Sequence, residues 1–145
     1  MNRATPQLRE FARRLNEHEA RQKESIRSHD PAVFAVLDRL RPPLSTLMGN
    51  GGHRALILRA LTLAGAEFPW MHGARVAPDG ALNASLVIQG EVEPMELSRG
   101  GVALVAQLIG LLVAFIGEKL TLQLLLDIWP KLPRRDWDFI KRDST

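Results

Sequence analysis

The sequence predicts a mainly helical domain: a bundle-like core of four or five helices, with one β-hairpin over about residues 74–88 and a long C-terminal helix over about 94–129. Three observations support this fold class. Most apolar residues recur at spacings of three and four, the period of an amphipathic helix. Only one region combines a turn signature with short alternating runs. The chain has 145 residues, of which 46% are hydrophobic and 24% charged, which is enough for one domain with a core of its own.

The N-terminal segment, residues 1–29, is predicted to be a polar, arginine-rich helix or arm. Leu8, Phe11 and Leu15 form one short apolar stripe. The sequence NEHEARQKES that follows is almost entirely polar, so we expect it to lie outside the hydrophobic core. The arm is therefore expected to be an exposed helix, or to become ordered only when a partner binds it.

The core domain, residues 30–130, is predicted to begin with two helices, over about 31–40 and 53–67. An Asp-Pro pair at the start of the first helix provides an N-cap and a proline at the first helical position. Pro42-Pro43 is expected to end or bend that helix. The glycine-rich stretch at 49–52 is expected to separate the two helices by a sharp break.

A β-hairpin is predicted for ARVAPDGALNASLVI, residues 74–88, because Pro-Asp-Gly is a turn signature between two short alternating runs. An isolated hairpin is only marginally stable, so we expect it to lie on helices. The long helix that follows is expected to begin near Pro94 and to stop at Pro130, because proline cannot continue a helix. Residues 131–145 are predicted to form a basic tail.

The run Gly100–Gly117 carries no charged side chain, so it is either a membrane span or a core helix. Eighteen residues at 1.5 Å each cover about 27 Å, just under the thickness of a bilayer's hydrocarbon core. Basic residues follow from Lys119 onward, which would place the C-terminus of a membrane protein inside. However, glycines and Gln107 interrupt the run, and apolar residues continue beyond Lys119 in an amphipathic pattern. A core helix explains the segment better.

Small residues form a ridge on one face of this helix. Such a ridge lets another helix approach closely, both in membranes and in soluble bundles. Either the helix over 53–67 packs there, or the same helix of a second copy does so in a symmetric dimer. The residues of this predicted interface are Ala103, Ala106, Gly110, Ala114 and Gly117.

The loop Gly49–Arg54 resembles a phosphate-binding turn at a helix N-terminus. Gly51 and Gly52 would offer backbone N–H groups to an anion, and Arg54 a positive charge. No Lys-Ser/Thr pair follows and no strand is predicted before it, so it is not a P-loop. A plain turn between two helices would need the same glycines.

No constellation of residues indicates a reaction, and we expect no catalytic residue, metal site or cofactor. The chain has no cysteine, which excludes disulfides, thiolate zinc sites and cysteine nucleophiles. Its four histidines form no HExxH motif. Ser28, His29 and Asp30 are adjacent in the chain and therefore cannot adopt the geometry of a catalytic triad.

The charge distribution is typical of solvated helix surfaces. The formal net charge is only +3, although the pI is about 9.9, and carboxylates alternate with the basic residues. Nucleic acid is not an expected partner. The connection between the helices over 31–40 and 53–67 is too long for a helix-turn-helix, and the second helix is mostly apolar.

The sequence thus predicts a non-catalytic interaction or adaptor protein, with regulation as one role. It would form a dimer through the Gly100–Trp129 helix and contact a protein partner through its N-terminal arm or C-terminal tail. We expect a cytoplasmic location, because cysteine is absent and the N-terminus lacks the apolar region of a signal peptide. One alternative is a membrane-anchored or membrane-inserting protein that uses Gly100–Gly117. The other is an anion- or nucleotide-binding protein that uses the Gly49–Arg54 loop.

Overall fold

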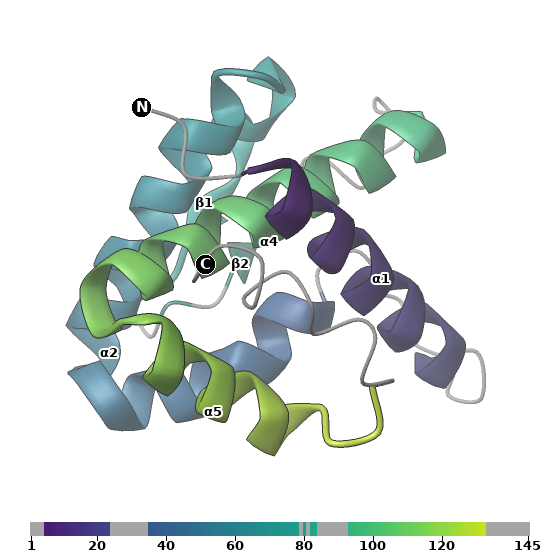
Figure 1. Ribbon diagram of the computed structural model, residues 1–145. Coiled ribbons are helices and arrows are strands. Elements are labelled where there is room, and N and C mark those ends of the chain that lie inside the picture. The colour runs from purple at the N-terminus through teal and green to yellow at the C-terminus, as the bar shows by residue number, and fades with distance from the viewer. Residues whose placement is uncertain (1–4, 24–34, 79, 81, 84–92, 133–145) are drawn as a thin grey trace.

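The computed structural model describes residues 5–23, 35–78, 80, 82–83 and 93–132, and its fold is mainly helical, as predicted. In Figure 1, α4 crosses the middle of the molecule and packs against α1, α2 and α5. The predicted cap at Asp30, the residues of the hairpin beyond 83 and the tail beyond 132 lie outside the described residues. The elements in chain order are α1 (Pro6–Lys23), α2 (Ala35–Gly65), a 3₁₀ turn η2 (Pro69–Gly73), β1 (Arg75–Val76), β2 (Leu82–Asn83), α4 (Pro94–Ile116) and α5 (Glu118–Ile128).

The uncharged run of the sequence is the central helix of the bundle. Leu104, Leu108 and Leu112 of α4 are fully buried, and so are most of the residues between them. A helix that is apolar on all sides is stable in water only when other helices surround it. Its neighbours α1 and α2 provide that surrounding, and their apolar residues belong to the same hydrophobic core.

The N-terminal helix is docked on this core, contrary to the expectation of an exposed arm. The Leu8 N–H donates to the Thr5 hydroxyl at 3.2 Å, so Thr5 caps α1, and Pro6 occupies its first position. Phe11 and Leu15 are buried. The buried stripe does not stop at Leu15, because Glu19 continues it one turn further.

The helices predicted over 31–40 and 53–67 are two parts of one kinked helix, α2. This helix continues through Pro42-Pro43, where the prediction placed an end or a bend. Proline lacks the N–H that would bond to the carbonyl four residues earlier. The carbonyls affected belong to Asp38 and Arg39, which are exposed, so water can replace the missing donors. The break lies at Gly49, within the glycine-rich stretch that was expected to separate the two helices. Its φ of 78° and ψ of 163° are accessible essentially to glycine alone.

The helix predicted over 94–129 is divided into α4 and α5 by a second glycine. Gly117 has φ 88° and ψ 160°, nearly the same conformation as Gly49. Its N–H donates to the Val113 carbonyl at 3.0 Å and closes the last turn of α4. The chain therefore turns at Gly117, and α5 packs against α4 instead of extending it.

The predicted hairpin is present as two short antiparallel strands, in which Arg75 pairs with Asn83 and Val76 with Leu82. It lies on α2, as expected. Its turn contains Gly80, with φ 87°, where an added Cβ would lie 2.1 Å from Nδ1 of the buried His53. Only glycine allows the turn to approach His53 this closely.

Candidate interaction surface

Half of the large apolar side chains that are exposed in the described residues lie in the segment that contains the corner between α4 and α5; the others are Leu47, Leu58 and Met95. Phe115, close to the end of α4, is 69% exposed, and Leu120 and Leu126 of α5 are 42% and 40% exposed. Leu47 of α2, which faces α5, is 48% exposed. Scattered exposed leucines are ordinary, but a cluster of this kind indicates a contact surface.

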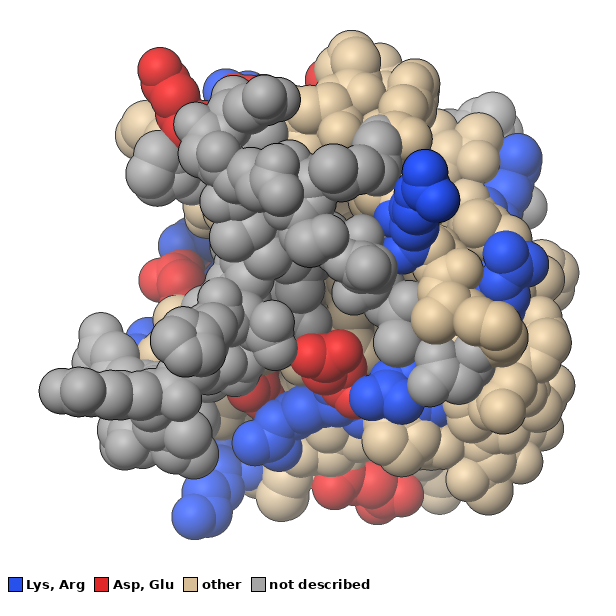
Figure 2. Space-filling view, turned by 180° about the vertical axis from the view of Figure 1, so that it is seen from behind, with Lys and Arg blue, Asp and Glu red and all other residues tan. Residues whose placement is uncertain are grey.

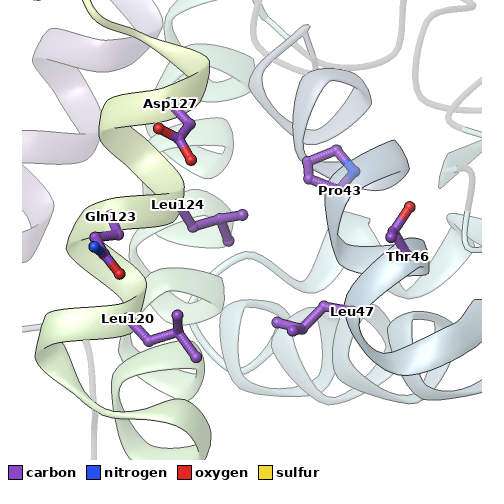
Figure 3. Close-up of a pocket in the computed structure, with 7 residues that line it drawn as sticks. All are labelled: Pro43, Thr46, Leu47, Leu120, Gln123, Leu124 and Asp127. Carbon is purple, nitrogen blue, oxygen red and sulfur yellow. The ribbon is translucent and has the colours of Figure 1, made fainter.

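A groove of about 580 Å³ separates α5 from the first half of α2. Figure 3 shows side chains of the two helices on its opposite sides, with Leu120 and Leu47 pointing toward each other. The polar groups Gln123 and Asp127 lie along the α5 side. The groove is lined by Pro43, Thr46, Leu47, Leu120, Gln123, Leu124 and Asp127.

The outer face of α5 forms a strip of mixed chemistry. Thr121 and Leu125 are buried on the inner side of this helix. The exposed residues cover an arc of about 120° at 100° per residue, centred on Gln123. We call this arc the α5 strip; its residues are Lys119, Leu120, Gln123, Leu126 and Asp127.

The structure divides the predicted ridge of small residues into two parts. Ala103, Ala106 and Gly110 are buried within the single chain, so a second copy could reach them only if the bundle opened. Ala114 and Gly117 are exposed and lie beside Phe115 in the chain. The ridge as a dimer interface stays a prediction, and only its exposed end is accessible in the folded chain.

The predicted anion-binding residues follow the kink of α2. Gly51, Gly52 and Arg54 are exposed, and Gly49 interrupts the helix just before them. The first N–H groups of a helix that begins after such a break have no partners within the helix. A helix N-terminus of this kind suits an anion, but nothing else in the described residues points to a ligand, and the anion site stays a prediction.

Sequence reasoning missed a buried carboxylate that joins three parts of the chain. The Trp129 indole N–H, just beyond α5, donates to Glu19 of α1 at 2.5 Å. Arg39 of α2 forms an ion pair with the same Glu19 oxygen at 2.7 Å. Glu19 lies four residues after Leu15, on the buried face of α1, and that spacing was the available signal.

The Glu19 cluster borders a hollow of about 350 Å³, which Asp127 and Lys131 also line. The Glu19 carboxylate already accepts from two donors. We therefore interpret the cluster as a structural contact that connects α1, α2 and the residue just beyond α5. Among the described residues, no three His, Asp or Glu side chains lie close enough together to hold a metal ion.

The solvent face of α1 carries its own ion pairs. Glu10 accepts hydrogen bonds from Arg13 and Arg14, and chiefly the Arg13 bond lowers the pKa of Glu10 from 4.5 to about 2. Arg9 binds Glu67, at the end of α2, with two hydrogen bonds of 3.1 and 2.6 Å. Figure 2 shows basic and acidic side chains interspersed along the lower edge of the opposite side of the molecule. Along that edge the two signs are mixed, so these charges do not form a field of one sign there.

Comparisons with known proteins found no protein-family model, no curated protein and no solved structure that matches the chain.

Proposed function

We propose that this is a non-catalytic interaction protein that self-associates through the corner between α4 and α5. The observation that carries the proposal is the cluster of exposed apolar residues there: Phe115, Leu120, Leu126 and, across the groove, Leu47. Burying one large apolar side chain completely is worth about 1.5–3 kcal/mol. Several such side chains on one surface provide a driving force that the rest of the charged surface lacks.

A membrane role is the second candidate. By length and composition, the segment Met95–Ile116 of α4 could cross a bilayer. However, 67% of its most apolar window is buried in the fold, so insertion would require α4 to leave α1 and α2. Flotation of the purified protein with lipid vesicles tests this candidate. Recovery with the vesicles, together with a monomeric mass in their absence, would favour it over self-association.

The proposed function is tested by the mass of the protein in detergent-free solution, measured by light scattering over a wide concentration range. We expect the mass to rise from 16.2 kDa toward twice that value. Phe115→Ser should weaken this association at least about tenfold, because about 1.4 kcal/mol of apolar contact is lost.

Met95 provides a matched control. It is 77% exposed, more than Phe115, but it lies at the opposite end of α4, about 30 Å away by helical rise. Met95→Ser should leave the association unchanged. A wild-type protein that stays monomeric at all concentrations refutes the proposal, and equal effects of the two substitutions would show that the association is unspecific.

A further inference from the structure

We infer that two copies pair through α5 in antiparallel orientation, around a twofold axis at Gln123. This inference rests on the proposed self-association and specifies its geometry. Its basis is the arrangement of charges along the α5 strip. Lys119 lies four residues before Gln123 and Asp127 four residues after it. Leu120 and Leu126 lie three residues before and three after.

An antiparallel pair converts this arrangement into charge complementarity. In a twofold antiparallel pair centred at Gln123, residues of the two copies pair by their distance from Gln123. A residue that lies some positions before Gln123 in one copy is opposite the residue that lies the same number of positions after Gln123 in the second copy. Lys119 therefore lies level with Asp127 of the second copy, once at each end of the contact. A parallel pair would place Lys119 beside Lys119 and Asp127 beside Asp127, which is repulsive. The charges thus select both the partner, a second copy, and its orientation.

The strip is free to make this contact in the folded chain. All five of its residues are exposed, while Thr121 and Leu125 hold the inner side of α5 against the bundle. Leu120 and Leu126 contribute the apolar part of the contact, one position nearer to its centre than the charges.

Neighbouring apolar residues enlarge the contact. The helix has 11 residues and is about 16 Å long, short for an interface of roughly 1,200 Å². Leu47 extends the apolar surface across the groove, and Phe115, which precedes α5 in the chain, is exposed as well. We therefore expect a weak dimer, with a dissociation constant in the micromolar range.

Charge exchange tests the orientation directly. Lys119→Asp places two carboxylates level with each other at both ends of the pair, and Asp127→Lys places two ammonium groups there. Each single substitution should raise the dissociation constant about tenfold or more at low salt. An equimolar mixture of the two variants should associate again as a heterodimer, because both ends then pair opposite charges. The double variant K119D/D127K should associate like the wild type.

Arg59→Asp is the matched control, since it makes the same charge change at an exposed position of α2 away from the strip, and it should leave the association unchanged. Circular dichroism establishes that each variant is folded. The salt dependence of the dissociation constant distinguishes the two orientations. Added salt should weaken an antiparallel pair, whose charges attract, and strengthen a parallel one, whose charges repel.

Each outcome has one meaning. Single substitutions that leave a self-associating protein unaffected overturn the antiparallel α5 pairing but not the proposed function. A parallel pair would behave in this way, because each substitution would only exchange one like-charge contact for another. A mixture and a double variant that both stay monomeric, or association that strengthens with salt, overturn the antiparallel arrangement. A monomeric wild type removes both proposals.

Discussion

Glu19 is a charged residue that the fold holds almost entirely out of water. A buried carboxylate is costly unless hydrogen bonds and an opposite charge replace its hydration. Here the Trp129 indole provides the hydrogen bond, and the half-exposed Arg39 provides the charge. Glu19 therefore favours one register of α1 against the rest of the bundle. If α1 shifted along its axis by one residue, the carboxylate would be buried without these partners.

Replacing Glu19 should therefore destabilise the protein. Glu19→Ala leaves the buried Trp129 N–H without an acceptor, and we expect a loss of about 1–3 kcal/mol in the free energy of unfolding. Glu19→Gln keeps an acceptor oxygen and should cost less. Glu17→Ala is the control; Glu17 is exposed, and its substitution should change stability by less than about 0.5 kcal/mol. Urea denaturation measures all three, and equal losses for Glu19→Ala and Glu17→Ala would refute the role of Glu19.

At the scale of elements, two glycines determine where helices end. Gly49 and Gly117 share a backbone conformation that side chains disfavour, yet an added Cβ at either position would meet nothing within 4 Å. The requirement for glycine is therefore one of backbone conformation and not of space.

Gly49→Ala and Gly117→Ala should each lower the free energy of unfolding by about 1–3 kcal/mol. Gly51→Ala provides a control of opposite sign. Gly51 is helical and also has open space around it, so alanine should leave stability unchanged or raise it by up to about 1 kcal/mol. Thermal unfolding of the three variants checks the expectation, which fails if Gly49→Ala behaves like Gly51→Ala.

These glycines also explain which parts of the fold could be predicted. The helical segments could be read from the spacing of apolar residues, because that signal is local. The breaks could be predicted only in part. The kink at Gly49 lies in the glycine-rich stretch that the sequence marked as a break, but the turn at Pro42-Pro43, also expected to end or bend the helix, faces water and stays helical. Gly117 was indistinguishable in the sequence from the helical Gly110.

The candidate surface was also predictable only in part, because it depends on a turn and on long-range contacts that leave no local signal in the sequence. The apolar character of the C-terminal segment was evident. The placement of Lys119 and Asp127, and of Leu120 and Leu126, at equal distances from Gln123 was also available in the sequence. Which of its residues face solvent depends on the turn at Gly117. The groove itself joins residues of α2 and α5 that are about 80 positions apart, a distance that no local pattern spans.

At the scale of the whole molecule, α4 organises the bundle. It contacts α1, α2 and α5, so most of its apolar surface is buried against other described helices of the same chain. Truncating a core leucine should then destabilise the entire fold, because the lost contacts and the remaining cavity affect every helix around it.

Leu108→Ala should lower the free energy of unfolding by about 2–5 kcal/mol, since Leu108 is fully buried. Phe115→Ala, on the same helix but largely exposed, should change it by less than about 0.5 kcal/mol when the protein is dilute enough to be monomeric. Chemical denaturation in aqueous buffer compares the two. A small effect of Leu108→Ala would show that α4 is not packed as a core helix.

The contact between Glu19 and Trp129 also has a consequence for synthesis. The two residues are 110 positions apart, so at roughly 5–20 residues per second about 5–20 s pass between their translation. During that interval the Glu19 carboxylate has no indole donor, and water must solvate it. The N-terminal helix, although it is made first, can complete its docking only when the ribosome has nearly finished the described chain.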